Sequence, residues 1–162
     1  TDIIGHYLGA RPVGITARTE VRRNERENGL LWHQDAAFLG GRVQALDVWT
    51  ALTPVGDRCP SVDVLPVRLE GLVGMGEQES TLSQSRLPLT YLGPDDPAVA
   101  QLTAQATPTT AVLAPGDALL LDELTLHRTG VAPWTRPSRE VAVTWFFAPS
   151  RFPSALGRAC AF

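Results

Sequence analysis

Two of the three histidines in this chain stand where metal ligands are expected. His33 and Asp35 flank Gln34, and His127 follows far downstream. Neighbouring side chains alternate between the faces of a β-strand, so a strand over residues 30–38 points His33 and Asp35 to one side. An imidazole from a distant strand then supplies a third ligand. Two histidines and one carboxylate, with open positions opposite them, are the ligands of non-haem Fe(II) sites that activate dioxygen.

The size and charge of the chain narrow its class. Its 162 residues suit one domain, 1–162, and 44% hydrophobic with 19% charged residues is ordinary for a globular protein. A net charge of -3 gives no basic field for nucleic acid. No apolar run is long enough to span a membrane, and the two cysteines have neither zinc spacing nor disulfide density. We therefore expect a cytoplasmic protein with no nucleic-acid or membrane partner.

The composition and the first residue carry two further expectations. All 14 basic residues are Arg, and Ala, Gly and Pro are abundant, which indicates a GC-rich bacterial genome. The sequence begins at Thr1 rather than Met. We expect an N-terminal part of the protein to be missing from it.

The elements that must position the candidate ligands are predicted to be short strands. Apolar stretches alternate with Gly and Pro turns, which favours an all-β sandwich or barrel. Strands are predicted at 13–21, 30–38, 44–55, 61–67 and 138–147. Two further strand pieces within 111–122 are divided by a turn at Pro115, Gly116 and Asp117. One short helix is expected within 93–108.

The region from Gly74 to Thr110 is the least regular part of the sequence. It is polar and rich in Ser and Pro, and it joins two strand-rich halves. Loops of this length in a compact domain are usually functional or disordered. The region is predicted to be a lid over the site or an insertion, with an inert surface loop as the alternative.

Several motifs occur in a definite order. HQD at 33–35 precedes DVWTAL at 47–52 and VDVLPVRLEG at 62–71; PGDALLLD at 115–122 and LHRTG at 126–130 precede SREVAVTWFFAP at 138–149. In this order they resemble the phytanoyl-CoA dioxygenase family of Fe(II)/2-oxoglutarate-dependent oxygenases. The resemblance implies a double-stranded β-helix, that is, a cupin-like jelly roll with few short helices and iron in its mouth. Arg68 departs from the family, which often has a Gly-Ser-His-like ending there, so the substrate side is less well defined.

The resemblance also implies roles for individual residues. The iron ligands would be His33, Asp35 and His127. Arg139 matches the arginine that pairs with the far carboxylate of 2-oxoglutarate. The positions that line or touch the co-substrate pocket would be Gln34, Trp49 and Thr129.

Physical chemistry supports the mapping of Arg139 independently. A guanidinium fork binds a carboxylate through two hydrogen bonds. Arg139 begins the strongest predicted strand, whereas its rival Arg136 sits between Thr135 and Pro137 in a predicted loop. Thr129 lies two residues after His127, so on a strand the two share a face.

The implied reaction consumes dioxygen and 2-oxoglutarate and releases succinate and CO2. Hydroxylation of a small-molecule substrate is the default outcome, and a natural-product intermediate is the substrate that we expect. Desaturation, ring closure, epoxidation and epimerisation use the same kind of iron centre, and the sequence does not choose among them.

Two alternatives remain open at the level of sequence. A three-histidine iron site of the cupin type would use His6, His33 and His127 and would not need Asp35. A non-catalytic jelly-roll domain that binds a small molecule would hold no tight metal and turn over no co-substrate. Metal analysis of the purified protein separates these possibilities.

Overall fold

The computed structural model describes residues 2–15, 19–25, 31–39, 43–73, 91–130, 138–153, 156 and 160–161. The helices are α1 (Asp2–Leu8), α2 (Ala36–Leu39), α3 (Pro97–Thr103) and the 3-10 helix η2 (Pro149–Arg151). The strands are β1 (Val13–Gly14), β2 (Glu20–Glu25), β3 (Ala45–Ala51), β4 (Val62–Val64), β5 (Thr109–Thr110), β6 (Ala118–Asp122), β7 (His127–Thr129), β8 (Ser138–Phe147) and β9 (Cys160–Ala161).

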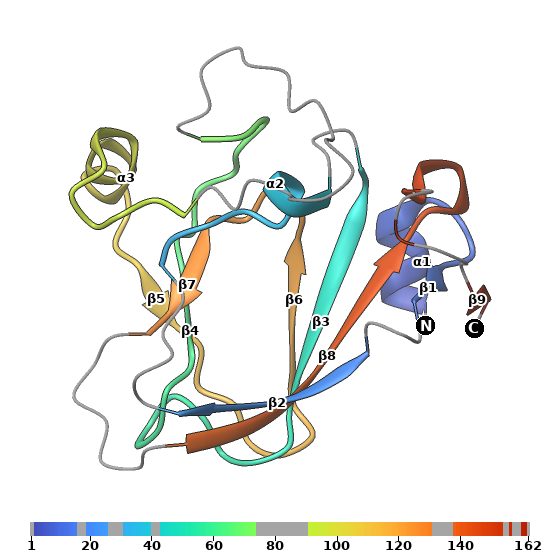
Figure 1. Cartoon of the computed structure of the whole chain (residues 1–162), viewed down its shortest axis with the longest axis horizontal. Helices are drawn as coiled ribbons and strands as arrows, with labels where there is room; N and C mark the ends of the chain where they lie inside the picture. Colours follow the sequence, from blue (N-terminus) through green and yellow to red (C-terminus); the bar gives the residue numbers. More distant parts are fainter. Residues whose placement is uncertain are drawn as a thin grey trace.

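The strands form two antiparallel sheets that face each other (Figure 1). The larger sheet has the order β6-β3-β8-β1-β9, with β2 also paired to β8, and the smaller has the order β5-β4-β7. Helices are few and short and lie outside the sheets. This architecture confirms the predicted all-β jelly roll, the double-stranded β-helix.

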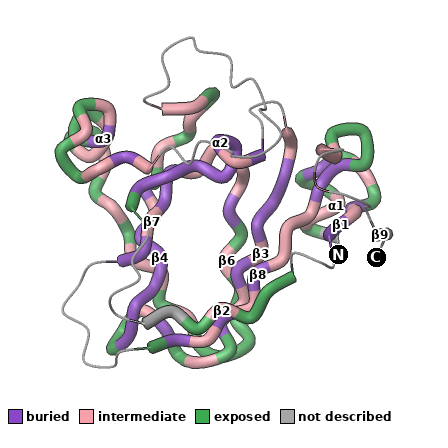
Figure 2. Tube along the Cα trace, in the orientation of Figure 1, coloured by how far each residue is buried: buried purple, intermediate pink, exposed green. Residues whose placement is uncertain are grey.

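Strand β8 is the central strand of the larger sheet. It pairs with β3 along one edge, from Ala45↔Phe147 to Ala51↔Val141, and with β2 and then β1 along the other. Its buried residues alternate, with Arg139, Val141 and Val143 turned inward, as a strand with one face on the core requires (Figure 2). The strand predicted at 138–147 is therefore confirmed to the residue.

A tight turn before β6 follows directly from its sequence. The Asp117 N–H donates to the Ala114 carbonyl at 3.0 Å, so Pro115 and Gly116 are the two central residues. Pro fixes the φ that the first position needs, and Gly116 has φ 95°, which only glycine adopts without strain. The predicted turn between the two apolar pieces is confirmed. Of the two pieces, only the second contains a regular strand, β6.

The prediction of a strand at 30–38 is wrong. Trp32 and His33 make isolated bridges, and the chain then turns at Asp35 into helix α2. The Phe38 and Leu39 amides donate to the Asp35 carbonyl, which closes this helical turn. The small-residue pair Ala36–Ala37 favours helix over strand here.

The region 74–110 is described only in part. Residues 74–90, the first part of the predicted lid, lie outside the described residues. The short helix expected within 93–108 is confirmed as α3, where the Asp96 side chain accepts from the Ala98 amide and Pro97 stands in the first turn. Within the described ranges, no helix has the length and apolar character that crossing a bilayer demands.

Apolar packing between the sheets supports the cavity described below. One buried cluster joins β3, β6 and β8 to the β4 side through residues that include Trp49, Val62, Leu121 and Val141. A second packs Trp32 and Leu126 against the α3 side. The first cluster therefore fixes the inner faces of the strands that line the cavity.

Candidate metal centre and its cavity

The two candidate histidine ligands are direct cross-strand partners. The His33 amide donates to the His127 carbonyl at 2.9 Å, and the His127 amide returns the bond to the His33 carbonyl at 3.0 Å. Residues paired in this way project side chains to the same face of the ladder. The two imidazole rings consequently lie side by side, with their centroids 4.2 Å apart.

Backbone carbonyls select one tautomer of each histidine. Nδ1 of His33 lies 2.8 Å from the Leu31 carbonyl, and Nδ1 of His127 lies 2.9 Å from the Thr125 carbonyl. A carbonyl only accepts, so each Nδ1 carries the proton and donates it. Each Nε2 then keeps its lone pair for a metal, in the supported arrangement that metal-binding histidines normally show.

Asp35 completes the group from the turn before α2. Ligand atoms of His33, Asp35 and His127 all lie within 4.8 Å of one another, and all three residues are buried. Oδ1 of Asp35 is 4.0 Å from Nε2 of His127, while Oδ2 is buried without a hydrogen-bond partner. The three residues come together as predicted, but a turn rather than a strand brings Asp35 to the histidines.

The protonation states suit a cation at this point. Burial, followed by the neighbouring His127, lowers the pKa of His33 to about 3, and burial also lowers the pKa of His127. Both imidazoles are therefore neutral near pH 7, as metal ligands must be. Burial raises the pKa of Asp35 to about 7, because an isolated buried carboxylate is costly. A metal ion would remove that cost.

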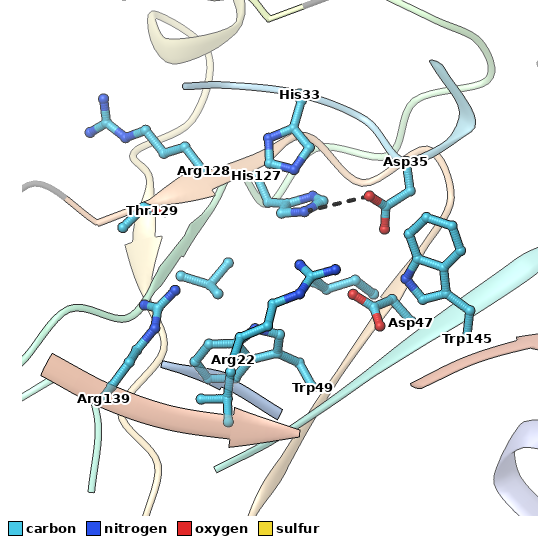
Figure 3. A pocket seen from close by; sticks show the side chains of 13 residues that line it. Arg22, His33, Asp35, Asp47, Trp49, His127, Arg128, Thr129, Arg139 and Trp145 are labelled. Atoms are coloured by element: carbon cyan, nitrogen blue, oxygen red, sulfur yellow. Dashed lines mark ion pairs between the residues drawn. The ribbon is translucent and has the colours of Figure 1, made fainter. Parts of the chain in front are cut away.

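The three candidate ligands line one side of a cavity between the two sheets (Figure 3). Trp49, Thr129 and Arg139, which were predicted to surround a co-substrate, also line it. Its apolar walls are Val62, Leu121 and Val141.

Arg139 carries a buried charge with unused donors. The residue is 3% exposed, and its Nε and Nη1 have no hydrogen-bond partner. Its guanidinium lies over the Trp49 ring, 4.7 Å from the centroid. Burial lowers the pKa of Arg139 to about 10, so it remains charged at neutral pH. A buried cation of this kind calls for an anionic partner.

Gln34 is not among the residues that line the cavity, in contrast to the prediction. Its amide nitrogen donates to the carbonyls of Gly71 and Leu124, and its amide oxygen accepts from the Val73 amide. These three bonds tie the 71–73 segment to the turn after β6. The structure therefore gives Gln34 a positioning role rather than a cavity contact.

The other sequence candidates lie apart from the cavity. His6 is exposed on α1 and belongs to no metal-ligand group found among the described residues, which disfavours the three-histidine alternative. Arg136, the rival of Arg139, lies outside the described residues.

Four polar residues of the cavity were missed by the sequence analysis: Arg22, Arg128, Asp47 and Trp145. The last two could have been found by alternation. Asp47 is two residues before Trp49 on β3, and Trp145 lies at an even spacing from Arg139 on β8, so each shares a face with a predicted site residue. Nothing in the sequence distinguishes Arg22, which points inward, from Arg23, whose side chain pairs with Glu140 near the surface.

Asp47 provides a prediction about pH. The residue is 8% exposed, and burial, followed by the nearby Asp35, raises its pKa from 3.8 to about 8. Between these values the folded chain holds a proton that the unfolded chain has lost, so the free energy of unfolding falls as pH rises. The free energy of unfolding of Asp47→Asn minus that of the wild type is therefore expected to be larger at pH 8 than at pH 5. The expected increase is at least about 1.4 kcal/mol, the equivalent of one pKa unit.

Urea unfolding of metal-free protein at the two pH values measures this difference. Asp57→Asn is the matched control, because the Asp57 side chain is exposed and already hydrated. An Asp47→Asn effect of equal size at pH 5 and pH 8 would show that burial does not disfavour the charged carboxylate.

Comparisons with known proteins place the fold. No family model and no curated protein matches the chain. Among solved structures, AviO1 from Streptomyces viridochromogenes Tue57 is similar at 18% identity and a TM-score of 0.60, over 94% of this chain and 58% of that one. EctD from S. alaskensis, crystallised with 2-oxoglutarate and 5-hydroxyectoine, is similar at 18% identity and a TM-score of 0.64, over 93% and 49%.

The epimerase SnoN, in complex with Fe3+, alpha ketoglutarate and nogalamycin RO, is similar at 16% identity and a TM-score of 0.61, over 91% of this chain and 54% of that one. This chain therefore spans about half the length of these proteins. At such identities the likeness shows the fold alone. The chain has a jelly-roll fold like that of EctD and SnoN, and its His33, Asp35 and His127 form a group that could bind a metal.

Proposed function

We propose that this chain is an Fe(II)- and 2-oxoglutarate-dependent oxygenase, similar to the phytanoyl-CoA dioxygenase family, that oxidises a small molecule. One observation carries the proposal. The group His33, Asp35 and His127 shares a cavity with Arg139, a buried cation whose Nε and Nη1 lack partners. A metal ion would satisfy the three-residue group, and a carboxylate of a dicarboxylic co-substrate would satisfy the buried guanidinium of Arg139.

The donor atoms fit Fe(II). Two neutral imidazole nitrogens and one carboxylate are the set that leaves positions open on a non-haem iron. A bound cation would give Oδ2 of Asp35, which has no hydrogen-bond partner, a partner. It would also favour the charged carboxylate and so lower the raised pKa of Asp35. Bound iron would supply the activation of dioxygen at the expense of 2-oxoglutarate, and the protein's residues do the positioning.

Arg139 is proposed to bind the far carboxylate of 2-oxoglutarate. Its guanidinium is fixed by the strand β8 and by the ring of Trp49, so the fork is oriented before the anion arrives. Thr129 lines the same part of the cavity and can add its hydroxyl group (Figure 3). The apolar walls exclude water, which strengthens this charge pair.

EctD and SnoN support the choice of co-substrate, because both are solved with 2-oxoglutarate in a fold like this one. A natural-product intermediate of a bacterium remains the proposed substrate, and hydroxylation the proposed outcome. The second candidate function is a non-catalytic jelly-roll domain that binds a small molecule.

Succinate release separates these two functions. Protein reconstituted with Fe(II) and supplied with 2-oxoglutarate and air is expected to form succinate slowly even without its substrate, and a metal-free sample is the control. A folded protein that holds no Fe(II) tightly and forms no succinate, with or without small-molecule extracts, would favour the binding-domain alternative.

Asp35 leads to a prediction about halide. Related iron halogenases lack the third protein ligand, so that halide can bind in its place. In this chain Asp35 occupies that position. Succinate formation by the wild type is therefore expected to be the same in chloride and in sulfate buffers at equal ionic strength, and no chlorinated product is expected. Asp35→Gly, which opens the position, is the control expected to respond to chloride. A chlorinated product from the wild type would contradict the assignment of Asp35.

A further inference from the structure

Arg22 is a second cation on the inner face of the larger sheet. The register of β2 and β8 pairs it with Val141, and Arg139 lies two residues from Val141 on β8. Cross-strand partners project to the same face, so the two arginines are diagonal neighbours there. Both line the cavity; burial is the main cause of the lowered pKa of Arg139, and the charge of Arg22 adds to it. Two like charges in one cavity repel each other unless anions accompany them.

The guanidinium of Arg22 turns unused donors toward the candidate metal centre. Its Nε donates to Glu20 at 3.2 Å, and within the described part of the chain no other hydrogen bond or ion pair involves this side chain. That pair is exposed, so it compensates little of the charge. Figure 3 shows the two terminal nitrogens of Arg22 pointing into the cavity, toward the metal ligands. This edge of a guanidinium can bind an oxyanion through two parallel hydrogen bonds.

The charges of the proposed site leave Arg22 without an anion. The positive charges of a divalent metal ion and Arg139 are cancelled by the Asp35 carboxylate and a dicarboxylate co-substrate. Arg128 has a largely buried ion pair of its own. Burial, followed by the nearby Asp35, favours the uncharged form of Asp47, and this residue makes no ion pair with Arg22 among the described contacts. The charge that remains on Arg22 matches one monovalent anion.

The position of Arg22 distinguishes it from the proposed co-substrate anchor. Arg139 is 3% exposed and lies deep in the cavity, whereas the Arg22 side chain is 42% exposed and borders solvent. A co-substrate bound to Arg139 and to the metal uses both of its carboxylates, so it leaves Arg22 unoccupied. A ligand that enters after the co-substrate therefore meets the Arg22 guanidinium on the solvent side, near the metal ligands.

We propose that Arg22 binds a carboxylate group of the substrate, so that the substrate is a small organic acid. This inference rests on the proposed function, because it assigns the substrate side of that site. The planar fork of Arg22 would fix the orientation of the carboxylate and with it that of the attached carbon atoms, one of which carries the C–H bond to be oxidised.

Small probes of similar size test the charge preference. The protein is loaded with Zn(II), which is redox-inert, and with saturating 2-oxoglutarate. Propanoate, propanamide and propylammonium are then added, and saturation-transfer NMR measures the dissociation constant of each. Propanoate is expected to bind in a saturable manner and at least about tenfold more tightly than the other two, because only the carboxylate accepts two charge-assisted hydrogen bonds from Arg22.

Substitutions of Arg22 test the residue itself. Arg22→Gln removes the charge and is expected to weaken propanoate binding at least about tenfold, while propanamide and 2-oxoglutarate bind as in the wild type. Arg22→Lys keeps the charge without the planar fork, so its affinity for propanoate should lie between the two. Arg23→Gln is the matched control expected to leave propanoate binding unchanged, because Arg23 is the next residue on β2 and pairs with Glu140 near the surface.

Two outcomes would overturn the proposal and leave the proposed function standing. One is the absence of a preference for propanoate among the three probes, or equal propanoate binding by the wild type and Arg22→Gln. The other is that Arg22→Gln weakens the binding of 2-oxoglutarate and of 2-oxopentanoate alike. The second compound lacks the far carboxylate, so this result would assign Arg22 to the metal-side carboxylate of the co-substrate.

A failure of the proposed function itself would be seen earlier in the same experiment. Wild-type protein that binds neither Zn(II) nor 2-oxoglutarate, before any probe is added, contradicts the proposed function. Protein that binds both and then fails to select propanoate contradicts only the role of Arg22.

Discussion

His127→Ala is expected to lower the affinity for Fe(II) by more than about 100-fold and to abolish succinate formation. Loss of an outer partner of a metal ligand already costs about 10–100-fold, and here one of only three protein ligands is removed. His33→Ala should behave alike, because the two imidazoles are paired across one ladder and face the same point. Iron content after gel filtration measures the loss.

His6→Ala is the matched control for this experiment. His6 is exposed on α1 and is not part of the ligand group, so its loss should leave iron content unchanged. Circular dichroism of the metal-free variants checks folding, because His127→Ala also leaves the Thr125 carbonyl without its partner. Full iron occupancy in folded His127→Ala protein would remove this residue from the site.

Arg139→Ala is expected to weaken 2-oxoglutarate binding by roughly 30- to 5,000-fold. Loss of one partner of a buried, hydrogen-bonded charge pair costs about 2–5 kcal/mol, and each 1.4 kcal/mol corresponds to about tenfold. Arg139→Lys keeps the charge but loses the planar fork, so its affinity should lie between those of the alanine variant and the wild type. Calorimetry on protein loaded with Fe(II) under anaerobic conditions measures each constant.

Arg23→Ala is the control for this series. Arg23 lies on the neighbouring strand β2 and makes an exposed ion pair with Glu140, a kind of contact that contributes about 0–1 kcal/mol. The Arg23→Ala substitution should therefore leave the affinity for 2-oxoglutarate almost unchanged. If Arg22→Ala weakened binding more than Arg139→Ala did, the co-substrate anchor would move to Arg22, the other arginine that points into the cavity.

The confirmed strands are those whose patterns are strong and local. The strand at 138–147 alternates between buried and less buried residues from Ser138 to Val143. The turn at Pro115 and Gly116 depends on two residues whose backbone preferences leave little choice. The helix α3 begins at a capping Asp96 followed by Pro97. Each of these signals is complete within a few residues of the chain.

The path around Asp35 shows the limit of such signals. The expected strand would have placed His33 and Asp35 on one face by alternation, whereas a turn into α2 places them near one another. The three candidate ligands, chosen from their types and order, do lie together, although the predicted local geometry was wrong. Periodicity over nine residues cannot separate a strand from an extended residue followed by one helical turn.

The sequence by itself determined the all-β class, the strand that carries Arg139 and the residue types of the ligand group. Only the tertiary structure decided which polar side chains share the cavity. Arg22 and Arg23 are equivalent in the sequence, and the pairing of β2 with β8 turns the first inward. Asp47 and Trp145 meet because of the β3–β8 register. Such registers depend on contacts between segments far apart in the chain, so no local pattern contains them.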